Sequence, residues 1–158
     1  MTRSFKMIAA AALGAALLAG CGGPRYKDVA GTIPVMVPDT GRIYFYQPPA
    51  PLGVVSSQPY LRVNGMKVGR SKPGSFFYVN RPAGKYEIDT LRDGESLSFT
   101  LAPGQTRYVR LSIEGATGNG SVGRQDMRLE ESEAVAQHEL SPLKYWGAGS
   151  RERVKLRP

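Results

Sequence analysis

Short segments of alternating apolar and polar residues, separated by turn residues, run from residue 42 to residue 113 and constrain the fold most strongly. Residues 42–47, RIYFYQ, are rich in aromatic and β-branched side chains, which is typical of strands. Residues 95–101 place Leu97, Phe99 and Leu101 on one face and hydroxyl side chains on the other. Further segments of this kind are residues 60–69, 75–80, 85–91 and 106–113.

The Asn64-Gly65 pair within residues 60–69 predicts a tight β-hairpin, because both residues accept the positive φ of a two-residue turn. The expected register pairs Val63 with Met66 and Leu61 with Val68 on one face. It sets Arg62 opposite Lys67 on the other face. Like charges that face each other repel, so we expect this second face to be open to water or to an anion. Asp93-Gly94 and Pro103-Gly104 predict two further turns.

One helix is predicted, over residues 132–140, with Ser132 as its N-cap, Glu133 in its first turn and Pro142 beyond its end. The fold class that follows is mainly β. We expect a small antiparallel β-sandwich, or a partly open barrel, of about seven or eight strands with one short C-terminal helix.

The N-terminal residues have the pattern of an export signal. Arg3 and Lys6 precede an apolar run from Met7 to Gly20, which is too short to span a bilayer. The run ends in Leu18-Ala19-Gly20-Cys21, which resembles the lipobox of bacterial lipoproteins. The resemblance implies cleavage between Gly20 and Cys21 and acylation of the Cys21 thiol. The alternative is an ordinary signal peptide that precedes a buried thiol.

Cys21 is the only cysteine, so no disulfide can form within the chain and the core must stabilise the domain. The formal net charge of +8 falls to +6 when Arg3 and Lys6 are removed with the signal. We expect a cleaved signal at residues 1–20, a lipidated flexible tether at 21–41, a β-sandwich domain at 42–146 and a basic tail at 147–158. In the alternative for the tether, residues 32–37, TIPVMV, add an edge strand.

The sequence carries no strong catalytic or metal-binding pattern. A hydrolase could use at best Ser121, His138 and Asp126, and no nucleophile elbow accompanies them. Histidine and cysteine are too few for a metal centre, so we predict neither a metal nor another cofactor. Three glycines match the spacing of a dinucleotide-binding loop, but the residues after them have the pattern of another strand. They are Gly118, Gly120 and Gly123.

Basic and aromatic side chains supply the candidate contact sites. Four cations surround the predicted hairpin, and an aromatic pair follows the predicted helix. Cations beside a membrane favour anionic lipids, although they also serve solubility. The aromatic pair could close one end of the sandwich or stack on a sugar or a partner protein. The candidate contact residues are Arg62, Lys67, Arg70, Lys72, Tyr145 and Trp146.

Several ordered motifs together resemble the bacterial lipoprotein family known as domain of unknown function 2846. They are GRIYFYQP, YLRVNGMKVGRSKPGSFFYVNRPAGKYEI, LAPGQTRYVRL and VGRQDMRLEESEAVAQHEL, within residues 41–140. The resemblance implies a small β-sandwich on a lipid anchor, and it brings no catalytic residues.

The expected function is therefore that of a non-enzymatic, membrane-anchored periplasmic lipoprotein that binds or scaffolds within the cell envelope. Gly22 after the cysteine favours the outer membrane. The alternatives are an envelope hydrolase or polysaccharide-processing enzyme near Ser121 and His138, and a module that binds anionic lipid or glycan through the Arg62 and Lys67 face. The expected partners are the membrane and an envelope protein, lipid or glycan. Nucleic acid is not expected, because the signal directs the chain away from it.

Overall fold

The computed structural model describes residues 23–52, 58–90, 96–114 and 124–147. Within these ranges the chain forms nine strands and short helices, so the mainly β prediction is confirmed. The strands are β1 (Thr40–Gln47), β2 (Tyr60–Val63), β3 (Met66–Arg70), β4 (Ser75–Pro82), β5 (Gly84–Thr90), β6 (Ser96–Leu101), β7 (Thr106–Glu114), β8 (Arg124–Glu130) and β9 (Lys144–Tyr145). The helices are α2 (Tyr26–Val29), the 3-10 turn η1 (Ala30–Thr32) and α3 (Glu133–Leu140).

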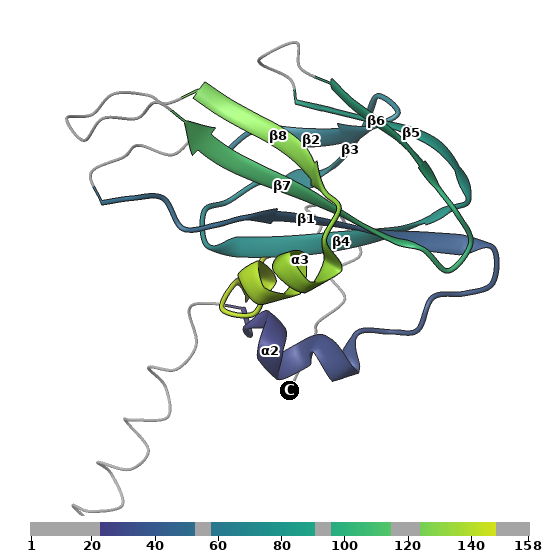
Figure 1. The fold of residues 1–158 in the computed structure, drawn as a ribbon, viewed down its shortest axis with the longest axis horizontal. Coiled ribbons are helices and arrows are strands. Elements are labelled where there is room, and N and C mark those ends of the chain that lie inside the picture. The colour runs from purple at the N-terminus through teal and green to yellow at the C-terminus, as the bar shows by residue number, and fades with distance from the viewer. Residues whose placement is uncertain (1–22, 53–57, 91–95, 115–123, 148–158) are drawn as a thin grey trace, which may run out of the picture.

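The strands form two sheets that pack face to face (Figure 1). One sheet has the order β8-β7-β1-β4-β9 and the other has the order β3-β2-β5-β6. The first sheet is mixed, because β1 runs parallel to β7 and β4 runs parallel to β9. The expectation of a purely antiparallel sandwich is therefore wrong for this sheet. A hairpin in the second sheet separates β1 from β4, and another separates β4 from β7, so β1 is distant in sequence from both of its neighbours.

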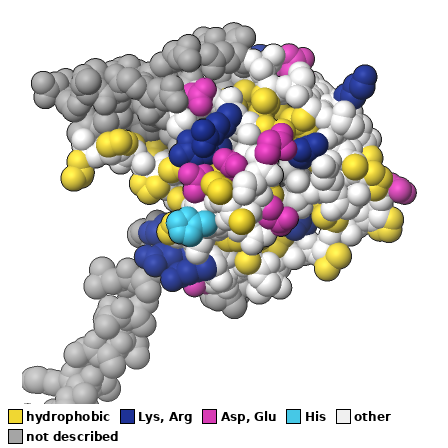
Figure 2. Space-filling view, in the orientation of Figure 1, with side chains coloured by type: hydrophobic (Ala, Val, Ile, Leu, Met, Phe, Trp, Pro, Cys, Tyr) yellow, Lys and Arg dark blue, Asp and Glu magenta, His cyan; other side chains and the backbone are white. Residues whose placement is uncertain are grey.

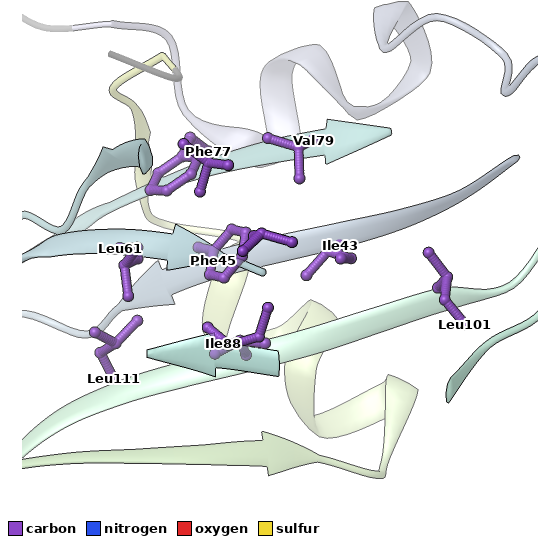
Figure 3. Close-up of a cluster of buried hydrophobic side chains, with 11 residues drawn as sticks. Ile43, Phe45, Leu61, Phe77, Val79, Ile88, Leu101 and Leu111 are labelled. Carbon is purple, nitrogen blue, oxygen red and sulfur yellow. The ribbon is translucent and has the colours of Figure 1, made fainter. Parts of the chain in front are cut away.

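The main core lies between the two sheets and consists of side chains that alternate along the strands (Figure 3). Ile43 and Phe45 of β1 face Leu61 of β2 and Ile88 of β5, and all four are buried. The Phe45 and Phe77 rings stack with their centroids 5.0 Å apart. Leu101 points inward as predicted, while Leu97 and Phe99 pack at the margin of the same core.

A second apolar layer covers the outer face of the mixed sheet. Tyr44, Tyr46 and Phe76 point outward from this sheet and are buried beneath α2 and α3. The strand β1 is therefore apolar on both faces, which explains why residues 42–47 do not alternate cleanly. Ser132 caps α3 as predicted, since its Oγ accepts a hydrogen bond from the Val135 amide at 3.4 Å.

The segment predicted to be a flexible tether is folded from its third residue onward. The Val29 side chain of α2 is fully buried, and the Tyr26 ring packs against the Tyr44 and Phe76 rings. The Tyr26 amide also donates to the Leu143 carbonyl at 2.8 Å. Residues 33–37 form no strand, so the edge-strand alternative is wrong as well. Four residues cannot sustain a helix alone, and packing on the sheet stabilises this one.

The predicted hairpin forms, but its register differs from the prediction beyond the first two residue pairs. Asn64 and Gly65 have φ values of 49° and 76°, as the turn requires. Val63 pairs with Met66, whereas Leu61 pairs with Gly69 because a bulge shifts the register. A side chain at Gly69 would overlap the Phe77 ring, so the bulge places the residue without a Cβ against this ring. The Asp93-Gly94 turn lies outside the described residues.

Candidate functional site

The six predicted contact residues fall into two separate groups. Arg62, Lys67 and Arg70 lie on the β2-β3 hairpin, at the edge of the second sheet. Lys72, Tyr145 and Trp146 lie at or beside β9, at the edge of the mixed sheet. The sequence placed Lys72 with the hairpin, but the fold separates it from that group.

Partners that sequence reasoning missed neutralise or cover the hairpin cations. Arg62 donates to a carboxylate oxygen of Asp89 on the neighbouring strand β5. The Lys67 ammonium lies 3.8 Å from the centroid of the Tyr60 ring, and the Arg70 guanidinium lies 5.6 Å from it. Only the pairing of β2 with β5 brings Asp89 to Arg62. This face was expected to be open to water or to an anion, and for Arg62 the anion is a carboxylate of the chain itself.

A shallow hollow of about 450 Å³ lies beside this hairpin. Asn64 joins the hairpin turn to β5. Its backbone amide donates to the Glu87 carbonyl, and its side-chain Oδ1 accepts from the Glu87 backbone amide, each at 2.8 Å. The lining offers one cation, one carboxylate, hydroxyl groups and two half-buried rings. These residues are Asn64, Lys85, Tyr86, Glu87, Ser98, Phe99 and Thr100. The apolar surface of the two rings therefore lies among hydrogen-bond donors and acceptors.

The second group places a cation directly on the only tryptophan. The Lys72 ammonium lies 3.8 Å from the centroid of the Trp146 ring, which is 49% exposed. The Trp146 amide donates to the Phe76 carbonyl at 2.9 Å, so β4 fixes the position of this residue. Tyr145 instead packs its ring against Phe76 and Tyr78. Trp146 is therefore the member of the aromatic pair that faces outward.

A polar cluster joins α3 to the outer face of the mixed sheet. Glu139 accepts hydrogen bonds from the Tyr46 hydroxyl at 2.8 Å and from the Arg110 Nε at 2.9 Å. Burial raises the pKa of Glu139, but these hydrogen bonds and the charge of Arg110 outweigh it, and the net pKa is lowered. Burial, with the Glu139 hydrogen bond and charge, raises the pKa of Tyr46. The cluster attaches the helix to the sheet, which is a structural role.

Arg42 is a buried cation that holds the N-terminal segment on the same sheet. Its Nε donates to the Asn80 side chain at 2.9 Å, and a terminal nitrogen donates to the Pro34 carbonyl at 2.5 Å. The guanidinium carbon lies 4.7 Å from the centroid of the Tyr78 ring. These contacts explain why residues beyond α2 follow the sheet.

The hydrolase candidates are not joined in the part of the chain that the structure describes. His138 is exposed on α3, and no hydrogen bond connects it to Asp126. Asp126 instead accepts a hydrogen bond of 3.4 Å from Ser112. Ser121 and the three glycines of the dinucleotide-like spacing lie outside the described residues. The residues that follow those glycines form β8, antiparallel to β7, as the strand pattern predicted.

Two further searches cover the described residues alone. They contain no group of three or more His, Cys, Asp or Glu side chains placed to hold a metal ion. Within the same ranges, no helix is both long enough and apolar enough to cross a bilayer.

The architecture defines a class of protein: a two-sheet β-sandwich with helices on the outer face of one sheet and a polar face on the other. Comparison with family models gives the family. Residues 38–123, more than half of the chain, match the family described as "Protein of unknown function (DUF2846)", and the chain belongs to it. The match ends before β8 and α3, so it is shorter than the resemblance through residue 140 that the motifs suggested. Searches among curated proteins and among solved structures found no significant match.

Proposed function

We propose that the protein is a non-enzymatic lipoprotein of a bacterial cell envelope, anchored through Cys21 to the outer membrane. The observation that carries this proposal is the N-terminal pattern: two cations, an apolar run too short to span a bilayer, and Leu18-Ala19-Gly20-Cys21. Gly22 supports the outer membrane as the destination. In this role the folded domain is presented to the periplasm.

We propose that the domain binds or scaffolds an envelope partner through the outer face of the β3-β2-β5-β6 sheet, the uncovered face, over which the described residues place no helix. Helices cover the mixed sheet, whereas side chains of β5 and β6 in the second sheet line the hollow. Lys85 and Glu87 are exposed there, and Arg62 with Asp89 supplies a paired charge beside them. A polar face of this kind favours a partner that offers hydrogen bonds and charges of both signs.

The anchor is tested by Cys21→Ser in cells labelled with a clickable fatty acid. We expect the natural chain to incorporate the label and to sediment with membranes, and the variant to do neither. Gly31→Ser is the matched control, because a side chain at Gly31 meets no atom within 4 Å. Labelling of the Cys21→Ser variant would contradict the anchor.

The binding face is tested by crosslinking in living cells from a photoreactive residue at Ser98, followed by mass spectrometry. We expect a specific envelope protein to be captured from Ser98 and not from a matched photoreactive residue at Lys27, which is exposed on α2. The same capture from both positions would argue against a dedicated face.

An anionic lipid or glycan is a second candidate ligand for the hairpin side of this face. Lys67 and Arg70 both lie over the Tyr60 ring, and neither makes an ion pair among the described residues. Binding of purified anionic envelope polymers should weaken with added salt and with Lys67→Ala, but not with Lys27→Ala. Binding that is equal at low and high salt would exclude this ligand class.

A further inference from the structure

Basic and apolar side chains gather at the end of the sandwich where the described chain begins. Leu52, in the loop after β1, is fully exposed, and Trp146 is half exposed. Arg25 and Lys144 are exposed, and Lys72 lies over the Trp146 ring. Figure 2 shows Lys and Arg side chains near the point where the described chain begins. These five residues are called the anchor-end surface.

Backbone pairing holds the elements of the anchor-end surface together. Arg25 forms an antiparallel bridge with Lys144, and the Tyr145 amide donates to the Pro24 carbonyl at 2.8 Å. The Lys144 amide donates to the Gly74 carbonyl at 3.0 Å, which brings the turn after Lys72 to β9. The Gly74 amide donates to the Gln47 carbonyl, so the loop that carries Leu52 leaves from the same place.

The charge of this surface is unbalanced within the described part of the chain. Arg25, Lys72 and Lys144 form no ion pair there, whereas Arg62, Arg107, Arg110 and Arg128 elsewhere each face a carboxylate. Trp146 presents an apolar ring with a polar nitrogen, a combination that favours the boundary between lipid and water. Lysine and arginine beside such a ring favour lipid phosphates.

The distance from this surface to Cys21 is short because Gly23, two residues after Cys21, already lies on the domain. A side chain at Gly23 would overlap the Tyr145 carbonyl oxygen, so Gly23 already packs on β9. Residues 21 to 23 can extend at most about 7 Å, whatever their conformation. A lipid on Cys21 would therefore hold the domain against the bilayer instead of on a tether of some twenty residues.

We propose that the anchor-end surface lies on the anionic face of the membrane that holds the Cys21 lipid, with Trp146 and Leu52 at the lipid–water boundary. This inference rests on the proposed anchor. Lys72, Lys144 and Arg25 contact lipid phosphates, and the strands of both sheets stand with this end toward the bilayer. The uncovered face of the second sheet then remains open to partners in the periplasm.

The single tryptophan makes this orientation measurable with the whole lipidated protein. The protein is reconstituted into phosphatidylcholine vesicles with and without phosphatidylglycerol, and Trp146 fluorescence is recorded with a lipid-borne nitroxide quencher and with aqueous acrylamide. In anionic vesicles we expect quenching by the nitroxide and protection from acrylamide. Added salt should reverse both effects.

Failure of this proposal is distinguishable from failure of the anchor. Protein that does not float with the vesicles contradicts the anchor. Protein that floats while Trp146 remains open to acrylamide and unquenched by the nitroxide overturns the docking. Equal lipid quenching in neutral and anionic vesicles overturns the preference for an anionic surface.

Paired variants test which residues position the domain. Lys144→Glu should lower the ratio of docked to undocked protein by about fivefold or more, because a cation near an anionic surface contributes roughly that factor. Lys85→Glu, on the uncovered sheet face, should leave the ratio unchanged. Gly23→Ala should detach the first residues from β9 and lower the ratio, whereas Gly31→Ala should not. Equal effects within either pair would overturn the assigned surface.

Discussion

The Lys72 ammonium lies 3.8 Å from the centroid of the Trp146 ring, although the two residues are far apart in sequence. The contact exists because β9 pairs in parallel with the start of β4, directly after the turn that carries Lys72. Sequence reasoning grouped Lys72 with the hairpin, and it left Trp146 either to close the sandwich or to stack on a sugar or a partner protein. The fold brings these two residues together.

Loss of this cation should change the environment of Trp146 and lower stability slightly. For Lys72→Ala we expect a shifted tryptophan emission and a loss of about 0.5–1 kcal/mol in the free energy of unfolding, the usual range for an exposed cation–π contact. Urea unfolding followed by fluorescence measures both. Lys85→Ala, which lacks an aromatic partner among the described residues, is the control. Identical emission from Lys72→Ala and the natural chain would contradict the contact.

Glu139→Gln should destabilise the protein at neutral pH and much less in acid. Hydrogen bonds from Arg110 and Tyr46 lower the pKa of Glu139 in the folded state below its ordinary 4.5, despite burial, which raises it. The carboxylate therefore stabilises the fold above pH 4.5, and this contribution is lost as the pH falls through the lowered pKa.

We expect Glu139→Gln to cost about 1–2 kcal/mol at pH 7, as for the loss of charge-assisted hydrogen bonds. Urea unfolding across the acidic range measures the difference. Glu87→Gln on the uncovered sheet face is the control and should cost little. A penalty for Glu139→Gln that stays constant down to pH 3 would show that the carboxylate charge is not responsible.

The buried tyrosines should make the fold sensitive to alkali. Burial raises the pKa of Tyr108 from 10.0 to about 12, and it raises those of Tyr44 and Tyr46 further. Folding therefore favours the protonated tyrosines. Their contribution to the free energy of unfolding is full below pH 10, and it is lost as the pH rises through their pKa values in the folded state.

A spectrophotometric titration should show some of the eight tyrosines ionising near pH 10 and the others only as the β-sheet circular dichroism is lost. The Tyr108→Phe variant should show a smaller absorbance change than the natural chain in the late phase, because it has one buried tyrosine fewer. Ionisation of all tyrosines near pH 10 with the sheet signal intact would contradict the buried layer beneath the helices.

Gly69→Ala should destabilise the sandwich because a Cβ at this position would lie 2.6 Å from the Phe77 ring. We expect a loss of about 1–3 kcal/mol, the usual cost of overpacking a core. Gly84→Ala is the matched control, since its added Cβ would meet only the Tyr86 ring at 4.0 Å. Thermal unfolding of the pair measures the difference, and equal midpoints would argue against the bulged register.

The sequence by itself determined most of the strands, the Asn64-Gly65 turn and the capped helix, but not β9. Alternation along residues 95–101 reports which face of a strand is buried, and Asn64-Gly65 specifies a turn, because both signals act over a few residues. The residue before α3, Ser132, likewise supplies the N-cap of that helix. The resemblance of residues 18–21 to a lipobox is also local, and so it is visible without a fold.

Tertiary structure alone decided which strands are neighbours and which side chains meet. Nothing local places β7 beside β1, Asp89 beside Arg62 or Trp146 beneath Lys72, because these pairs depend on strand order. The helix α2 and the bulge at Gly69 exist because the mixed sheet offers an apolar outer face and the Phe77 ring occupies space that a side chain would need. Contacts between distant segments form only when the whole core is assembled, so local sequence patterns do not record them.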